Sequence, residues 1–147
     1  MSHSATRSFE WGLGLSEIKG LDGRTTGTEI ARIGHMLAHE KLDVYQCAIQ
    51  FLALAARLVD GLPKGQAALS DQLRRAALSI SSNIAEGSGK PTTADRKRFA
   101  GIARGSAMEC GAILDACRVL GIAEESILRE GKQLLVRIVS MLTKMCR

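Results

Sequence analysis

Four stretches of apolar residues at helical spacing, separated by breaks that contain glycine and proline, constrain the fold of this chain most strongly. Residues 41–60, 67–86, 92–120 and 124–145 repeat apolar side chains every three to four positions, which is the period of one buried helix face. The breaks fall at 61–65, 87–91 and Gly121, because glycine and proline stop helices. No stretch alternates with the period of a strand. The sequence therefore predicts an all-α fold, an antiparallel up-down-up-down four-helix bundle.

The third stretch is the longest, and its spacing gives a specific prediction of the buried face. Thr92 or Thr93 is a good N-cap, and Gly121 follows the last helical residue. Nine residues of this helix are predicted to share the face that packs into the bundle: Phe99, Ile102, Ala103, Ser106, Cys110, Ile113, Leu114, Cys117 and Leu120. The fourth stretch carries a wide apolar arc that continues to Met145.

Residues 1–35 differ in composition from the remainder of the chain. They hold six of the fifteen glycines, four basic and four acidic residues, and no sustained periodicity. Such a stretch cannot bury a core of its own, so we predict a disordered or weakly structured N-terminal extension over 1–35 and a bundle over 36–147. The alternative interpretation is that translation starts at Met36.

Localisation follows from what the sequence lacks. No apolar run approaches the roughly 20 residues of a membrane span, and no signal peptide is recognisable. The four cysteines show no tight framework spacing, so they are interpreted as reduced thiols. We therefore expect a cytoplasmic protein without a membrane partner.

Positive charge is concentrated in the middle of the chain. The formal net charge is +5, and residues 74–104 alone contain seven basic residues against two acidic ones. Clustered cations attract phosphate backbones without reading sequence, and no aromatic residues are interleaved to stack on bases. The sequence therefore predicts that these basic residues bind RNA or DNA. The alternative is that they form only a solvated basic face. The seven residues are Arg74, Arg75, Lys90, Arg96, Lys97, Arg98 and Arg104.

Two further features indicate association between chains. Gly101 and Gly105 lie on the outer face of the third helix, where each glycine costs up to about 1 kcal/mol relative to alanine. A partner helix, a phosphate backbone or simple tolerance would each account for them. The first helix has surplus apolar surface at Tyr45, Ile49 and Ala56, and exposed apolar patches of this kind indicate interfaces. We therefore predict a homo-oligomer that uses these five residues.

Enzymatic chemistry is not indicated. A metal site would need more ligands than His3, His35 and His39 supply, and Cys110 and Cys117 are expected to pack in the core. Asn83 is expected to satisfy a polar contact at a helix or subunit junction. No Ser/His/acid or Cys/His constellation can be assembled inside the bundle. The sequence predicts no catalytic residue, no metal, no cofactor and no enzymatic activity.

Three segments resemble a known family. Residues 42–46 (LDVYQ), 71–77 (DQLRRAA) and 79–87 (SISSNIAEG) are similar to the bacterial 23S rRNA intervening-sequence proteins. Gly105-Ser106 and Glu109 in the third helix also fit that family. The similarity covers residues 37–146 and implies a small four-helix bundle, for which most members have no assigned activity.

The accessory protein of diversity-generating retroelements is similar to that family. It is a basic homopentamer that engages nucleic acid and a reverse transcriptase, so the resemblance implies five subunits here. It also supplies an alternative function, that of a protein-interaction adaptor such as a reverse-transcriptase accessory subunit. Residues 1–35 have no counterpart in the family, which favours a start at Met36.

Overall fold

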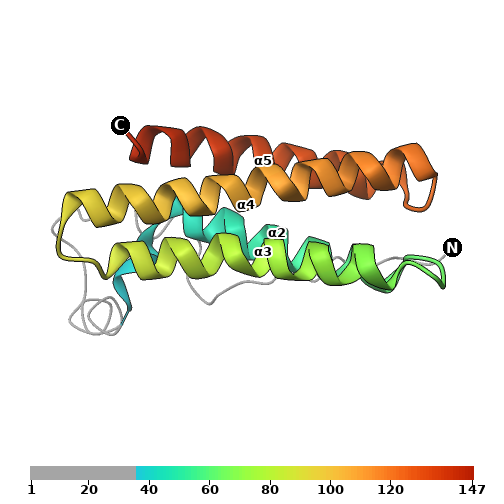
Figure 1. Cartoon of the computed structure of the whole chain (residues 1–147), viewed down its shortest axis with the longest axis horizontal. Helices are drawn as coiled ribbons and strands as arrows, with labels where there is room; N and C mark the ends of the chain where they lie inside the picture. The colour runs from blue at the N-terminus through green and yellow to red at the C-terminus, as the bar shows by residue number, and fades with distance from the viewer. Residues whose placement is uncertain (1–35) are drawn as a thin grey trace, which may run out of the picture. The chain divides into compact units, whose positions relative to one another are not determined.

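The computed structural model describes residues 36–147, and within them the chain is a four-helix bundle (Figure 1). A short 3₁₀ helix, η1 (Ala38–Lys41), precedes α2 (Asp43–Asp60), α3 (Ala67–Ser88), α4 (Thr93–Leu120) and α5 (Glu125–Met145). The predicted all-α, up-down-up-down fold is thereby confirmed. The predicted N-terminal extension and the alternative start of translation concern residues 1–35, which lie outside the described part.

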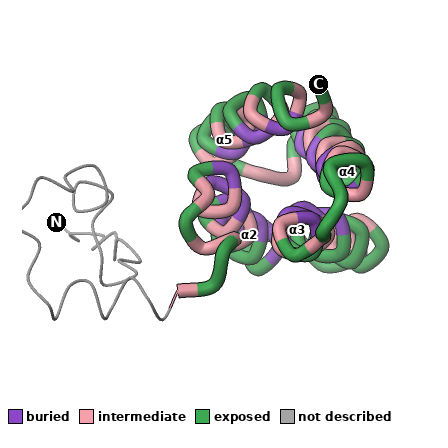
Figure 2. Tube along the Cα trace, turned by 90° about the vertical axis from the view of Figure 1, so that its left-hand side faces the viewer, coloured by how far each residue is buried: buried purple, intermediate pink, exposed green. Residues whose placement is uncertain are grey.

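Each helix packs against its sequence neighbours, and α5 closes the bundle against α2. Viewed end-on, the four helices surround one core, and the buried residues lie on the helix faces turned toward it (Figure 2). The backbones of α2 and α4 do not approach each other, so these helices stand on one diagonal, and α3 and α5 stand on the other. The outer faces of α2 and α4 are therefore on opposite sides of the bundle.

The ends of α4 follow from side chains that the sequence already identifies. Thr92 is the N-cap, and its hydroxyl accepts a hydrogen bond of 3.1 Å from the backbone N–H of Asp95, which satisfies one of the free donors of the first turn. Gly121 adopts the left-handed conformation at φ 63° and ends the helix, as glycine does without steric cost. Both predicted boundaries of this helix are confirmed.

The prediction that the second helix ends at Glu86 is wrong, because α3 continues through Gly87 to Ser88. Gly87 is buried, and a β-carbon placed on it would lie 2.9 Å from the β-carbon of Phe99 in α4. This glycine therefore allows α3 and α4 to approach each other closely, and the break in the chain begins only after it.

The predicted buried face of α4 is wrong at two residues. Ile102 is 43% exposed and Leu120 is 56% exposed, whereas Ala100 and Ala107 are buried instead. The buried residues of α4 recur every three or four positions, and Ile102 lies at the edge of the face they form. Leu120 is the last residue of the helix. Alanines on the face toward α3 leave room for the two helices to pack closely.

Ion pairs join the end of α4 to the beginning of α5. Arg118 donates two hydrogen bonds to the Glu125 carboxylate, 3.0 Å from Nε and 2.9 Å from Nη2, and it also lies 3.5 Å from Asp115. Lys132 Nζ donates to Asp115 at 2.8 Å. The loop between the two helices is thus held by charged side chains at the surface.

The Arg118 hydrogen bonds lower the pKa of the Glu125 carboxyl below its ordinary value of 4.5. A group with a lowered folded-state pKa stabilises the fold above its unfolded pKa, and that stability is lost as the pH falls through the folded value. We therefore expect acid to lower the free energy of unfolding less in Glu125→Gln than in the wild type. Urea unfolding at a series of pH values, from neutral down through the pKa of Glu125, measures this difference. Equal pH dependence in both proteins would contradict the prediction.

Candidate functional site

The turn between α3 and α4 and the first turns of α4 bring four of the predicted cations together. Lys90 Nζ lies 5.0 Å and the Arg98 guanidinium carbon 4.6 Å from the ring centroid of Phe99, so one buried ring carries both cations. Arg96 folds back on the turn, where its Nε donates to the Lys90 carbonyl at 2.8 Å and its Nη2 to the Pro91 carbonyl at 3.2 Å. We call Lys90, Arg96, Lys97 and Arg98 the basic cluster.

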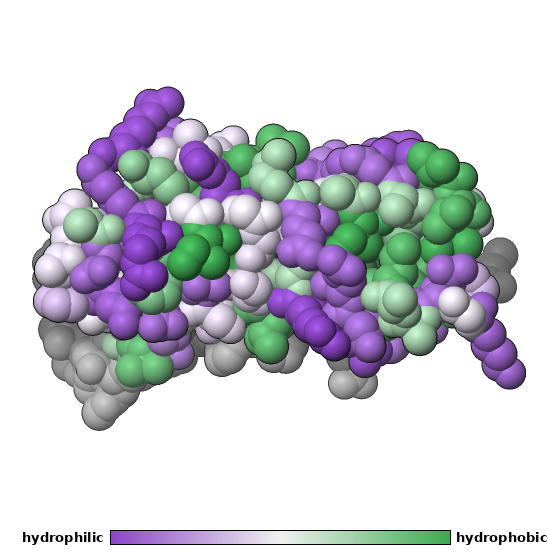
Figure 3. Space-filling view, in the orientation of Figure 1, coloured by the Kyte–Doolittle hydropathy of each residue, from purple (hydrophilic) through white to green (hydrophobic). Residues whose placement is uncertain are grey.

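The basic cluster is only partly neutralised. Lys90 pairs with Glu86 at 3.1 Å, and Arg98 reaches Asp95 at the longer distance of 3.9 Å. Arg96 bonds backbone carbonyls, which leaves its charge in place. Within residues 36–147, no carboxylate side chain lies within ion-pair distance of Arg96 or Lys97. Figure 3 shows hydrophilic residues over this end of the molecule.

The other three predicted cations lie elsewhere. Arg104 follows Arg98 by six residues, about 9 Å along the axis of α4. Arg74 points toward α2 and pairs with Asp60 at 3.4 Å. Arg75, one residue further along α3, lines a groove on the side of α4. The seven predicted cations therefore do not form a single continuous surface. Four of them form the basic cluster, and the other three lie apart from it.

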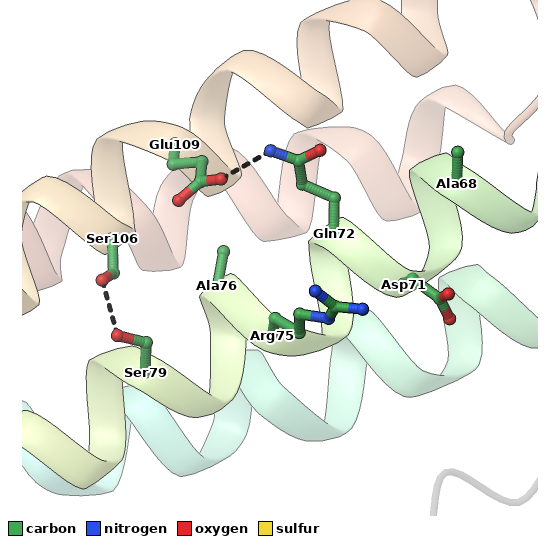
Figure 4. Close-up of a pocket in the computed structure, with 8 residues that line it drawn as sticks. All are labelled: Ala68, Asp71, Gln72, Arg75, Ala76, Ser79, Ser106 and Glu109. Carbon is green, nitrogen blue, oxygen red and sulfur yellow. Dashed lines mark hydrogen bonds between the residues drawn. The ribbon is translucent and has the colours of Figure 1, made fainter.

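The groove between α3 and α4 is a polar feature that the sequence did not predict. It has a volume of about 570 Å³, and Figure 4 shows Gln72 and Ser79 of α3 meeting Glu109 and Ser106 of α4 across it. Gln72 donates to Glu109 at 2.8 Å, and the hydroxyls of Ser79 and Ser106 share a hydrogen bond of 2.8 Å. Its eight lining residues are Ala68, Asp71, Gln72, Arg75, Ala76, Ser79, Ser106 and Glu109.

A sequence signal for the groove did exist. Most of its lining residues stand in the segments that carry the family resemblance, but a groove between two helices emerges only when their register is known. Asn83, expected at a polar contact, donates to the backbone carbonyl of Ser79 at 2.8 Å and to its hydroxyl at 3.1 Å. Through the Ser79–Ser106 hydrogen bond, Asn83 is linked to the junction of α3 and α4.

The five predicted interface residues lie on two opposite faces. Gly101 is half-buried and Gly105 is exposed on α4, and a β-carbon at either position would meet no atom within 4 Å. On α2, Tyr45 and Ile49 are half-buried and Ala56 is exposed. We call the α4 residues and the α2 residues the α4 patch and the α2 patch. Since α2 and α4 stand on one diagonal, the two patches face away from each other. The α4 patch has open space above it and includes the neighbouring Met108, which is 62% exposed.

Three of the four cysteine thiols, those of Cys47, Cys110 and Cys117, are buried. Burial raises the pKa of the Cys110 thiol to about 12, and it also raises the pKa of Cys47 and Cys117, so thiolate is scarce at neutral pH. Within residues 36–147, no group of three or more potential metal ligands is present; His3 and His35 lie outside this range. None of the helices in this range is long and apolar enough to cross a membrane.

Two comparisons with known proteins bear on this chain. The model of a family described as 23S rRNA-intervening sequence protein matches residues 40–144, a range that contains all four long helices. A comparison with curated proteins found no match. The family match agrees with the resemblance carried by the three sequence segments.

Proposed function

The chain belongs to the 23S rRNA-intervening sequence protein family, and from that premise we propose that it is a non-catalytic, oligomeric bundle of the cytoplasm that binds RNA or DNA without strong sequence preference. The observation that supports this proposal is the basic cluster at the start of α4. Lys90 and Arg98 lie over the Phe99 ring there, with Arg96 and Lys97 close in sequence. Among the carboxylates of residues 36–147, Glu86 and Asp95 are the ones that pair with these cations.

The proposed mechanism is electrostatic. Guanidinium and ammonium groups neutralise backbone phosphates and release condensed counterions, which gives affinity but no sequence information. Base stacking would require accessible aromatic rings. Among residues 36–147 the Phe and Tyr side chains are Phe51 and Phe99, which are buried, and Tyr45, which is half-buried. This composition favours contact with the phosphate backbone over recognition of single-stranded bases.

Self-association would raise the affinity of such a surface. We propose a contact in which the α2 patch of one copy covers the α4 patch of the next, and this contact is head-to-tail because the two patches lie on opposite sides of one molecule. Contacts of that type close into rings when the rotation between copies permits, and the resemblance implies five subunits. A ring repeats one weak cationic cluster several times, so the individual contacts add to a useful avidity.

A salt titration tests nucleic-acid binding directly. We expect the wild type to bind a short RNA or DNA duplex with an affinity that falls steeply between about 50 and 200 mM salt. Replacing Arg96, Lys97 and Arg98 by alanine should reduce the slope of log affinity against log salt by about 0.9 for each phosphate that the variant no longer neutralises. Fluorescence anisotropy across a salt series measures both the affinity and its slope.

The matched control removes three cations from the opposite end of the bundle, as Arg57→Ala, Lys64→Ala and Arg129→Ala. It has the same net charge as the test variant but keeps the basic cluster, so its slope should stay near that of the wild type. Thermal unfolding of both variants checks that the fold persists. The proposed interface would be refuted if the affinity of the wild type did not depend on salt concentration. It would also be refuted if both variants bound equally weakly.

The groove between α3 and α4 supports the adaptor as a second candidate. Arg75 stands there with Asp71 and Glu109, and a surface with both charge signs suits a protein partner better than a phosphate backbone. An adaptor, such as an accessory subunit of a reverse transcriptase, would keep a stoichiometric protein partner after nuclease treatment. A nucleic-acid-binding protein would lose its bound material under the same treatment.

A further inference from the structure

The end of α5 lies directly beside the beginning of α4. Lys97 Nζ donates a hydrogen bond to the backbone carbonyl of Arg147, and Cys146 Sγ lies 4.0 Å from the carbonyl oxygen of Lys97. Arg96 and Met145 line the same small pocket, of about 270 Å³. Figure 1 shows the C-terminal end of α5 and the start of α4 at the same end of the bundle. The last turn of α5 is therefore a direct neighbour of the basic cluster.

This part of the chain is strongly basic. Residues 131–147 contain four lysines and arginines and no aspartate or glutamate. Lys144 and Arg147 are exposed, and no carboxylate side chain in the region from 36 onward lies within ion-pair distance of either residue. In sequence they stand more than forty residues from the basic cluster, and the antiparallel fold brings their segment beside the start of α4.

We propose that Lys144 and Arg147 form the second half of one phosphate-binding surface, and that its ligand is the backbone of a nucleic-acid duplex. Neighbouring helices are about 8–10 Å apart, so cations on α4 and α5 form a band that is two helices wide. A duplex carries one negative charge per about 1.7 Å of its axis and can place several phosphates against such a band. The absence of exposed phenylalanine or tyrosine rings in the described chain favours a duplex over a single strand.

Lys97 is the positioning residue of this surface. Its ammonium group donates to the main-chain oxygen of Arg147, the residue after the C-cap of α5, and so lies near the negative end of the helix dipole. That contact holds the last turn of α5 against the first turns of α4. The cations of both helices are therefore presented on a fixed scaffold, which reduces the entropy cost when phosphates bind.

The inference rests on the proposed function, and a double variant separates the two. Lys144→Ala with Arg147→Ala should lower the salt slope of duplex binding by about 0.9 for each phosphate that these residues neutralise. The matched control is Arg57→Ala with Arg129→Ala, which removes the same charge at the opposite end of the bundle. Arg129 is about 22 Å from Lys144 along the same helix, so this control should keep the slope of the wild type. The probe is a short RNA duplex, with the single strand of the same sequence measured beside it.

Each outcome has one meaning. A reduced slope in the α5 variant alone, with the duplex bound more tightly than the single strand, supports the composite surface. If the basic-cluster variant loses binding while the α5 variant matches its control, nucleic-acid binding stands and the contribution of α5 is refuted. Tighter binding of the single strand would refute the duplex as ligand. If the wild type binds neither probe in a salt-dependent way, both the inference and the proposed function fail.

Discussion

A glutamate introduced at Gly105 is expected to convert the assembled protein into folded monomers. A side chain at this position meets no atom of its own chain within 4 Å, so the isolated bundle can accommodate it, and replacing a helical glycine adds helix propensity. In the proposed head-to-tail contact, the α2 patch of a neighbouring copy covers this position. A buried, unpaired carboxylate there would cost far more than the contact can supply.

Sedimentation velocity at micromolar concentration measures the outcome. The wild type should sediment as a species several times larger than the 15.8 kDa chain, and Gly105→Glu should sediment near the size of one chain. Gln133→Glu places the same new side chain on the exposed outer face of α5 and should leave the assembly intact. A monomeric wild type would refute self-association, and an assembled Gly105→Glu variant would refute the α4 patch as its interface.

Gly87→Ala is expected to destabilise the bundle by about 1–3 kcal/mol, the usual cost of overpacking. The added β-carbon would lie 2.9 Å from the β-carbon of Phe99, an atom fixed to the α4 backbone rather than the end of a flexible chain. Relief therefore requires the end of α3 and the start of α4 to move apart. That movement would also shift the ring on which Lys90 and Arg98 rest.

Gly111→Ala is the matched control for this effect. Its β-carbon would meet only Lys132 Nζ at 3.8 Å and a Leu135 methyl at 4.0 Å, which are ordinary contacts. The same chemical change in α4 should therefore raise stability by about 0.5–1 kcal/mol through helix propensity. Urea unfolding gives both values. Stabilisation by both alanines would show that α3 and α4 are not held at the distance the structure indicates.

The fold was largely predictable because its determinants are local. Helical periodicity and the breaks in it identified four helices. Thr92 begins α4 with a hydrogen bond from the backbone N–H of Asp95, and Gly121 ends it with a left-handed backbone conformation. The role of Gly87 was predicted wrongly because a glycine near a turn resembles a helix stop. Its actual role depends on Phe99 in the next helix, and that contact is not visible in local sequence.

The candidate site was predictable only in part. Lys90 and residues 96–98 lie close together in sequence, so their cluster follows from a single turn. The separation of Arg74 from Arg75 depends on how α3 is rotated between α2 and α4, and the polar groove depends on the register of α3 against α4. Lys144 and Arg147 could have been added from topology alone, because the fourth helix of an up-down bundle ends where the third begins.

The diagonal placement of α2 and α4 has a consequence for how substitutions combine. Groups that share no contacts contribute independently to the free energy of unfolding, so changes at Ala56 and Gly105 should be additive within a single chain. In a head-to-tail ring the same two positions become neighbours across copies. A non-zero interaction energy in a double-mutant cycle would then originate from the assembly and not from the folding of the chain.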